Sequence, residues 1–368
     1  MKKVVLKEVN HVCKSVYVHL PFCKNICSYC DFCKFLYNEE WVDKYLYSLE
    51  EEIKNNYKGE VIETIYIGGG TPSSLNINEL EKLLKITKIF KLNNEYEFTI
   101  EFNVEDIEKD KIELCKKYNI NRISIGVESF NKKNLNFLER NSVVNIEEKI
   151  SLVKKYFNNI NIDLIYALPS ETINDLEKDI DAFLKLEIPH ISCYSLIIEK
   201  HTKLNNYNIK PINEELDYKM YELINKKLSN YSHYEISNYA KEGYESRCNL
   251  TYWNNEEYYG FGVGASGYVD NIRYTNSKNI INYINKIYNK NEELVDKNEK
   301  MSYELILGFR KMKGINIEEF KKKFNKNIID VYNVKELLDK DMLQIKDNYI
   351  FINKNYLYMS NEILVNFV

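Results

Sequence analysis

Short apolar runs alternate with longer amphipathic segments over residues 15–200 of this chain. The apolar runs are rich in Ile, Val, Thr and Tyr, which is typical of strands buried on both faces of a sheet. The pattern predicts strands at Ser15–Leu20, Thr64–Gly69, Glu97–Phe102, Arg122–Val127, Asn161–Leu168 and His190–Leu196.

The segments between these runs have the apolar spacing of helices, as in Trp41–Lys54, Ile77–Phe90 and Ile146–Phe157. Strands that alternate with helices indicate parallel βα units, so the expected fold class is α/β. Six such units are too few for a closed barrel of eight strands. Periodicity alone does not separate a partial barrel from an open sheet.

The pattern changes near residue 298. We predict helices at Lys300–Met312, Ile317–Phe324 and Ile329–Leu338, followed by a hairpin over Met342–Ile352 that turns at Asp347-Asn348. Three helices and a hairpin predict a small winged-helix-like α+β domain. The expected division is therefore 1–210, an extension at 211–297, and 298–368.

The composition argues against several classes of protein. The net charge is −4 with acidic and basic residues interleaved, so there is no basic patch for nucleic acid. Winged-helix folds often bind DNA, but Glu304, Glu318, Glu319 and Asp341 lie among the lysines of this one. We therefore expect a structural or docking role there, with a DNA-binding regulator as the alternative.

The apolar runs also bear on location. None approaches the length of a transmembrane helix, and no apolar signal segment opens the chain. We expect a cytoplasmic protein whose cysteines are not paired in disulfides.

Three cysteines stand in one run as C-x3-C-x2-C, at Cys23, Cys27 and Cys30, with Tyr29 before the last. Three thiolates can hold three irons of a [4Fe–4S] cluster and leave the fourth iron open. An open iron can bind the amino and carboxylate groups of S-adenosylmethionine (SAM). This spacing resembles the radical SAM superfamily.

Two other sites would use Cys33 as a fourth ligand. A structural zinc site needs four ligands, usually in two separated pairs. Cys27, Cys30 and Cys33 also match the start of a ferredoxin motif, but Lys-Phe-Leu-Tyr follows where a ferredoxin continues with Cys-Pro. We expect Cys33 to be a neighbour of the cluster rather than a ligand.

Polar residues follow several of the predicted strands, at the edge where parallel βα folds bind ligands. Three glycines and Thr71 end the second strand, and glycine lets a backbone approach a ligand closely. Glu101 and Glu128 end the next two. Arg140 can offer a fork to a carboxylate, although its spacing alone equally fits a solvated charge. Asp163 is an acid within an apolar run and needs a partner, such as a ribose hydroxyl.

Motif by motif, the chain resembles the oxygen-independent coproporphyrinogen III oxidase family, also called HemN-like proteins, from residue 16 to its end. The resemblance implies a partial (β/α)6 radical SAM barrel with Cys23, Cys27 and Cys30 as cluster ligands. The contacts to SAM that it implies are Tyr17, Tyr29, Gly69, Gly70, Thr71, Glu101, Glu128, Arg140 and Asp163. Family members usually carry Gln at the position of Glu128, so that contact differs here.

The family has two branches. Oxidases carry a long N-terminal extension and a further cysteine two residues after Cys30, where this chain has Phe32. The other branch, the haem chaperones of the HemW type, has motifs that resemble residues 234–253 and 259–268. This branch implies haem as a third cofactor, haem-accepting proteins as partners, and an electron donor of flavodoxin or ferredoxin type. The oligomeric state is not determined by these motifs, and a homodimer is one possibility.

The alternative function is the oxidase reaction, in which a 5′-deoxyadenosyl radical drives decarboxylation of porphyrinogen propionates. One position bears on the choice. Haem chaperones usually have His where this chain has Cys248, and a second common His is Ser266 here. A thiolate is itself an axial ligand of haem, so Cys248 either replaces the histidine or marks a loss of haem binding. We expect His19 to be packed or hydrogen-bonded rather than a ligand.

Overall fold

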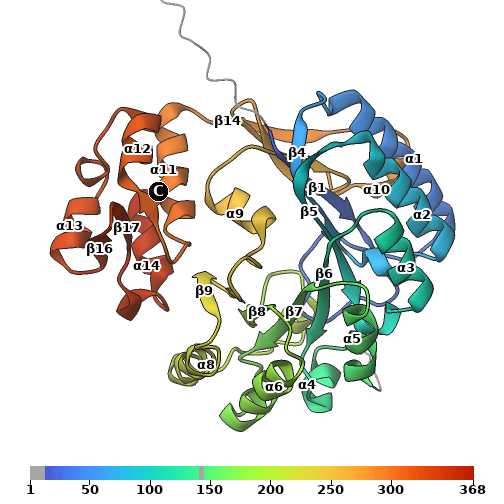
Figure 1. The fold of residues 1–368 in the computed structure, drawn as a ribbon, viewed down its shortest axis with the longest axis horizontal. Helices are drawn as coiled ribbons and strands as arrows, with labels where there is room; N and C mark the ends of the chain where they lie inside the picture. Colours follow the sequence, from blue (N-terminus) through green and yellow to red (C-terminus); the bar gives the residue numbers. More distant parts are fainter. Residues whose placement is uncertain (1–12, 141–144) are drawn as a thin grey trace, which may run out of the picture.

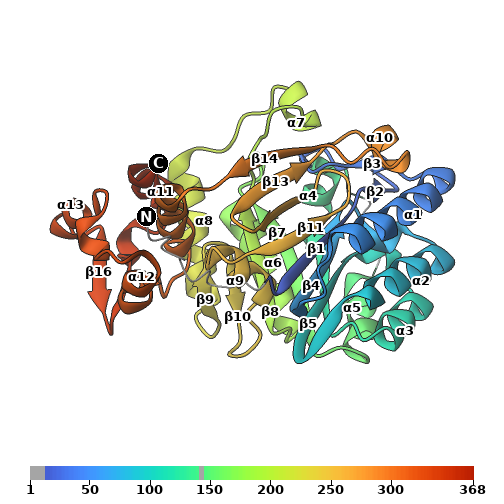
Figure 2. The same ribbon diagram turned by 90° about the horizontal axis from the view of Figure 1, so that it is seen from above.

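The computed structural model describes residues 13–140 and 145–368. Its centre is a mixed sheet of twelve strands in the order β14-β13-β12-β11-β1-β4-β5-β6-β7-β8-β10-β9 (Figures 1 and 2). The predicted strands are present as β1 (Ser15–Leu20), β4 (Val61–Gly69), β5 (Lys91–Asn103), β6 (Arg122–Glu128), β7 (Asn159–Tyr166) and β8 (His190–Ser195). They lie next to one another and run parallel, which confirms the α/β prediction.

The parallel part of the sheet has one more strand than the sequence predicted. β11 (Tyr258–Phe261) pairs in parallel with β1, Ser15 lying opposite Tyr258. This strand is short and is separated from β8 by a long stretch of chain, so the alternation of strands and helices did not predict it. The antiparallel strands β12 (Ser266–Val269), β13 (Ile272–Asn276) and β14 (Lys290–Leu294) extend that edge, and β10 (Asn238–Ala240) and β9 (Ser232–Glu235) extend the other.

Helices cover the outer face of the parallel strands (Figure 1). They are α1 (Glu39–Asn56), α2 (Ile77–Ile86), α3 (Lys109–Lys117), α4 (Lys132–Phe137), α5 (Ile146–Lys154) and α6 (Ile173–Lys185). Asn76 and Glu79 form a capping box that starts α2, which fixes its first turn. The predicted helix Ile77–Phe90 is shorter than expected, because Thr87–Ile89 forms a 3-10 turn. One continuous apolar cluster joins these helices, except α4, to the sheet, and Phe137 of α4 packs against a separate small cluster that contains Leu138 and Leu168.

The C-terminal part has its own apolar core. It contains α11 (Lys297–Gly308), α12 (Ile317–Phe324), α13 (Val334–Asp339) and α14 (Ser360–Leu364), and a sheet of β15 (Ile315–Asn316), β17 (Tyr349–Ile352) and β16 (Leu343–Lys346). The predicted hairpin is present. Asp347 and Asn348 have φ of 49° and 64°, the left-handed pair that a two-residue hairpin turn needs.

The third C-terminal helix differs from the prediction. Ile328–Asp330 is a 3-10 turn, and α13 begins only at Val334.

In the part of the chain that the structure describes, no helix has the length and apolar character needed to cross a membrane.

Residues 200–297 hold α7 (Lys203–Asn206), α8 (Glu214–Lys227), α9 (Arg247–Trp253) and α10 (Ile280–Ile284). The buried residues of α8 and α10 belong to the main apolar cluster. Figure 1 shows α9 between the main sheet and the C-terminal domain. The Ser246 hydroxyl caps this helix by accepting from the Asn249 N–H. At its first turn the backbone N–H of Cys248 donates to Glu97 of β5, at 3.3 Å. The helix is thereby tied to the base of the parallel strands.

Candidate cofactor site

The three-cysteine run lies in a loop that leaves and rejoins the end of β1. Its two ends, β2 (Phe22–Cys23) and β3 (Phe35–Leu36), pair in parallel. The Phe35 N–H donates to the Pro21 carbonyl at 2.7 Å, and the Tyr37 N–H donates to the Cys23 carbonyl at 2.8 Å. The loop is therefore closed at its base, which fixes where the first cysteine stands.

Two distant segments hold the middle of this loop. The Ser28 N–H donates to the carbonyl of Leu138 at 3.1 Å, and the Ser28 carbonyl accepts from the N–H of Leu204 in α7 at 3.0 Å. The Lys203 ammonium also donates to the Ile26 carbonyl, at 3.1 Å. The cysteine loop is thus clamped between the end of α4 and α7.

The predicted ligands lie close together at this loop. Burial is the largest cause that raises the pKa of each thiol, for Cys23 to about 11, and each pKa also responds to at least one of the other two cysteines or to charges beside the loop. The Thr71 hydroxyl donates to the Cys23 sulfur at 3.4 Å, and Arg140 Nη1 lies 3.8 Å from the Cys27 sulfur. Hydrogen bonds and a cation thus face two of the three sulfurs.

Cys33 stands apart from this group. Its side chain packs over Gly264 in the turn after β11, where a Cβ on the glycine would lie 2.8 Å from the Cys33 sulfur. The charges that shift its pKa are Lys278 and Lys34, not the other cysteines. Three thiols on the loop with the fourth turned away fit a cluster that keeps one iron open.

A site for a single ion would look different. Among the described residues, no three Cys, His, Asp or Glu side chains are grouped tightly enough to hold one metal ion. Each cysteine of a [4Fe–4S] cluster binds a different iron, so its ligands are spread more widely than those of a zinc ion. The donor set present here is sulfur only, which suits iron–sulfur chemistry.

The glycine loop at the end of β4 lies directly against the cysteine loop. The N–H of Gly70 donates to the Leu20 carbonyl at 2.7 Å, and the N–H of Thr71 donates to the Phe22 carbonyl at 2.8 Å. Gly69 has φ of +116°, and a Cβ there would lie 2.4 Å from the His19 ring. Only glycine meets both conditions. The His19 ring itself bonds to Tyr17 and to the Cys33 carbonyl, as expected of a hydrogen-bonded residue.

Glu101 places a buried carboxylate under this glycine loop. It accepts from the Tyr66 hydroxyl at 2.7 Å and from the Gly69 N–H at 3.1 Å. A Cβ at Gly68 would lie 2.7 Å from the carboxylate, so the glycine makes room for it. The pKa of Glu101 is raised to about 7, mainly by burial and to a lesser degree by the nearby Asp163. A carboxylate with so high a pKa is stabilised by a cationic ligand group.

Arg140 and Glu128 form a second charged pair, 3.6 Å apart and almost fully buried. Arg140 also donates to the Asn103 side chain at 2.9 Å and to the Gly126 carbonyl. Burial raises the pKa of Glu128 to about 7, and Arg140 opposes that rise. Arg140 is thus not the solvated charge that its spacing alone allowed.

The remaining predicted contacts lie on neighbouring strands. Asp163 in β7 accepts from Ser124 at 3.0 Å and from Asn161 at 2.9 Å. The Tyr29 hydroxyl lowers the pKa of Glu128 through a hydrogen bond, which places Tyr29 beside the Arg140 pair. The Tyr17 hydroxyl forms a hydrogen bond of 2.9 Å with Nδ1 of His19.

Sequence reasoning missed two residues of this site. Asn103 joins its parts, since its amide nitrogen donates to Thr71 at 3.4 Å and its oxygen accepts from Arg140. Tyr66 bonds to Glu101. Both lie in or at the end of a strand, two residues from Glu101 or Gly68. A search for polar side chains at the carboxyl ends of the predicted strands would have found Asn103.

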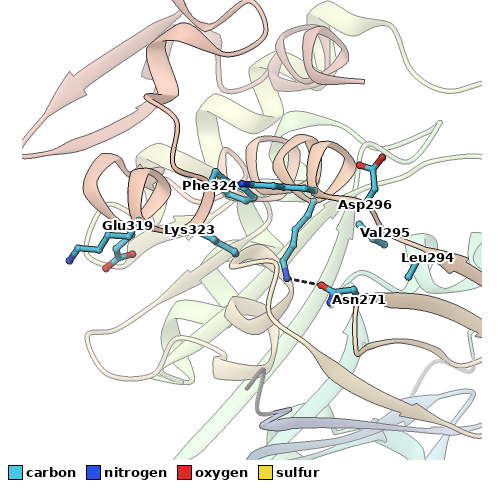
Figure 3. A pocket seen from close by; sticks show the side chains of 10 residues that line it. Asn271, Leu294, Val295, Asp296, Glu319, Lys323 and Phe324 are labelled. Carbon is cyan, nitrogen blue, oxygen red and sulfur yellow. Dashed lines mark hydrogen bonds between the residues drawn. The ribbon is translucent and has the colours of Figure 1, made fainter. Parts of the chain in front are cut away.

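Cavities do not by themselves mark this site. A cavity of ≈ 210 Å³ lies beside Cys27, Asn103 and Arg140. A larger one of ≈ 700 Å³ lies between β14, α11 and α12 (Figure 3). Its walls are Leu294, Val295, Phe324 and several lysines, with Lys300 bonded to Asn271, and no cysteine or histidine lines it. The smaller cavity is the one that adjoins a cysteine sulfur and the buried charges.

Cys248 lies away from the cysteine loop, at the first turn of α9. Its side chain is 1% exposed, and its sulfur lies 3.3 Å from the Tyr252 hydroxyl. Burial raises the pKa of this thiol to about 11. In this conformation the thiol is covered, so a haem ligated by it requires a movement of α9. Ser266 is exposed and bonds to Thr275 across the β12–β13 hairpin at 2.9 Å.

Comparisons with known proteins agree with this geometry. Residues 17–183 match the model of the radical SAM superfamily, and residues 295–355 match the HemN C-terminal domain. The chain is 38% identical to the heme chaperone HemW of Lactococcus lactis over 96% of this chain and 97% of that one. It is 34% identical to the HemW of Bacillus subtilis over 95% and 98%.

A solved structure shows the same fold. The coproporphyrinogen III oxidase HemN of Escherichia coli matches with a TM-score of 0.85, covering 97% of this chain and 90% of that chain, at 19% identity. At that identity the match establishes the radical SAM fold with its C-terminal domain and not the reaction. The identity to the relatives decides the family: this chain belongs to the HemW heme chaperone family of radical SAM proteins.

Proposed function

We propose that this protein binds haem for delivery to haem proteins on a radical SAM scaffold. In this proposal Cys23, Cys27 and Cys30 hold a [4Fe–4S] cluster. SAM is held by Tyr17, Tyr29, Gly69, Gly70, Thr71, Glu101, Glu128, Arg140 and Asp163.

The observation that carries the cofactor proposal is the three-thiol loop itself. Cys23 and Cys27 face Thr71 and Arg140, while Cys33 is turned away. Radical SAM sites have three protein thiolates and an iron left open for SAM. The haem proposal is supported by the relatives named heme chaperone HemW, which align with nearly the whole chain.

When bound, a reduced cluster with an open iron supplies one electron to the sulfonium of SAM. The chain's own residues have other tasks. The glycine loop brings backbone groups close to the ligand, and the Glu101 carboxylate lies beneath it to meet an ammonium. Arg140, held by Asn103 and Glu128, offers a cation next to Cys27 for a carboxylate. Burial of these groups excludes water from the site.

The partners belong to the proposal as well. We propose haem-accepting proteins as its clients and a flavodoxin or ferredoxin as its electron donor, in the cytoplasm. We also propose that residues 1–210, 211–297 and 298–368 act as the scaffold, the extension and the C-terminal domain. The extension supplies β9 to β14 of the main sheet and contains α9, which lies between that sheet and the C-terminal domain (Figure 1).

Anaerobic reconstitution with iron and sulfide tests the cluster. The wild type should bind about four irons per chain. Cys27→Ala should lose the cluster, whereas Cys33→Ala, a matched change on the same loop, should keep it. A full cluster in Cys27→Ala would mean that the ligand assignment is wrong.

Titration of the reconstituted protein with haem tests the chaperone function. A saturable change in the Soret band at one haem per chain is expected. If haem does not bind, and coproporphyrinogen III is decarboxylated in the presence of SAM and a reductant, the oxidase alternative replaces the proposal.

A further inference from the structure

The outer edge of β14 has no part in the proposed cofactor site. β14 is the last strand of the main sheet and pairs on one side with β13 (Figure 2). Among the described residues, no strand pairs with its other side. Residues 291–294 are all exposed, so this edge of the sheet is open to solvent.

The register of β14 on β13 shows which backbone groups face outward. Residues of an antiparallel pair bond to the partner strand at every second position. The N–H of Val295 donates to the Asn271 carbonyl of the β13 side at 2.8 Å, and Leu294 comes one residue earlier in the same register. The N–H and carbonyl groups of Leu294 and Glu292 therefore point away from β13. They offer two donors and two acceptors to a further strand.

An apolar cavity lies at the end of this edge. The cavity of ≈ 700 Å³ between β14, α11 and α12 has Leu294, Val295 and Phe324 in its walls (Figure 3). Leu294 is 72% exposed, although it lies directly at this cavity. Extended peptides that add to a sheet edge gain affinity from main-chain hydrogen bonds and specificity from pockets for alternate side chains. The edge of β14 and the cavity provide both features.

The charge of the cavity favours an acidic partner. Four lysines and two acids belong to its lining, namely Lys297, Lys300, Lys322, Lys323, Asp296 and Glu319. Lys323 lies 2.5 Å from Glu304, and Asp296 caps α11, so these two charges are already used. Burial and, to a lesser degree, Lys323 lower the pKa of Lys300, so a carboxylate placed beside Lys300 would stabilise its charged form.

A second copy of this chain fits the edge poorly. Glu292 is the middle residue of β14, so two copies paired antiparallel about the centre of the strand place Glu292 opposite Glu292. Like charges directly opposite each other destabilise a strand pair. A segment of another protein does not have this restriction.

We propose that the outer edge of β14 binds an extended segment of a partner protein. The segment adds one strand to the main sheet, with an apolar side chain in the cavity between β14, α11 and α12. An acidic residue next to that side chain meets Lys297, Lys300 and Lys322. This proposal goes beyond the haem function and does not depend on it.

Selection from a displayed library of short random peptides, on the full reconstituted protein, tests the chemistry of this site. The enriched peptides should alternate apolar and polar residues and should contain Asp or Glu. A selected peptide should slow deuterium exchange at the amides of Leu294 and Glu292, because both point outward. The proposal is overturned if no peptide is enriched, or if the enriched peptides leave exchange in β14 unchanged. Slow exchange at these amides without a peptide would also overturn it, because the edge would already be covered.

A pair of substitutions at Leu294 tests the backbone contact. Leu294→Pro removes the outward N–H but none of the bonds to β13, and proline is tolerated at such positions of edge strands. It should raise the Kd of the selected peptide by about tenfold or more in fluorescence anisotropy. Leu294→Ala keeps the N–H and should raise the Kd less. Equal effects of the two substitutions would mean that the peptide does not pair with the edge.

A second pair of variants tests the charge and guards against a folding defect in Leu294→Pro. Lys322→Glu reverses an exposed charge of the cavity and should raise the Kd of the peptide by about threefold or more. Lys321→Glu, a matched change at the neighbouring exposed residue of α12 outside the cavity lining, should bind as the wild type does. Equal affinity of Lys322→Glu and the wild type would overturn the assignment of the cavity.

Discussion

The buried pair Arg140–Glu128 gives a prediction whose magnitude follows from the structure. The two side chains are 8% and 11% exposed, and their nearest atoms are 3.6 Å apart. At an effective dielectric constant near 20, two unit charges at that distance attract by about 5 kcal/mol. Much of that attraction offsets the cost of removing the two charges from water, so the net value of the pair is small.

Removing one partner is a different perturbation, because it leaves a charge buried alone. Arg140→Met should destabilise the protein by about 3–5 kcal/mol at pH 8. In the E128Q background the same substitution strands no charge. Its cost should then fall by about 2 kcal/mol or more, leaving mainly the lost hydrogen bonds to Gly126 and Asn103.

The pH dependence of this coupling has a definite sign. The pKa of Glu128 is raised by burial to about 7, so the native carboxyl is charged at pH 8 and mostly neutral at pH 5.5. The coupling to Arg140 should therefore be larger at pH 8. A carboxyl with a raised native pKa also costs stability as the pH rises from about 4.5 to 7, because the native state binds its proton more tightly.

The assay is urea unfolding of the metal-free, reduced protein at pH 8 and pH 5.5, followed by tryptophan fluorescence. Wild type, both single variants and the double variant form one cycle. Equal costs of Arg140→Met in the two backgrounds, within about 0.5 kcal/mol, would refute the idea that the pair is coupled.

Three further predictions concern stability. Gly69→Ala should lower the free energy of unfolding by more than about 1 kcal/mol and weaken SAM binding in calorimetry, because Gly69 has φ of +116° and an added Cβ would lie 2.4 Å from a histidine ring. Gly243→Ala, at φ of +81° with nothing within 4 Å of an added Cβ, should cost less stability and leave SAM binding unchanged. The pKa of Glu171 is raised by burial to about 8. The free energy of unfolding of the wild type should therefore fall, relative to that of Glu171→Gln, by up to about 5 kcal/mol as the pH rises from 4.5 to 8. Stabilities of the two proteins that change in parallel with pH, measured by urea unfolding, would contradict this. Leu305→Ala, fully buried in the C-terminal core, should cost about 2–5 kcal/mol by urea unfolding, while Leu294→Ala, 72% exposed, should cost almost nothing.

The elements that sequence reasoning found were those with local signals. β1 and α12 begin and end where predicted, because an apolar run or an amphipathic period is complete within each. The hairpin at Asp347-Asn348 was found because these residue types tolerate the left-handed turn. The predicted helix Ile329–Leu338 failed since its first residues form a 3-10 turn, whose hydrophobic spacing over a few residues resembles that of a helix.

In the site, too, the features that sequence reasoning found were those with local signals. The spacing of Cys23, Cys27 and Cys30 indicated the cluster because three ligands on one short loop are a local property of the chain. The position of Cys33 relative to them was not determined by spacing. It depends on Gly264, which lies in the turn after β11, more than two hundred residues later in the chain.

The sequence by itself therefore determined the βα alternation, the cysteine loop and the polar residues at strand ends. Only the tertiary structure decided that Arg140 is buried against Glu128, that Asn103 links it to Thr71, and that Cys248 is buried at the first turn of α9. The physical reason is that charge states and burial depend on which surfaces meet. Those surfaces come from parts of the chain whose separation in sequence carries no signal of their contact.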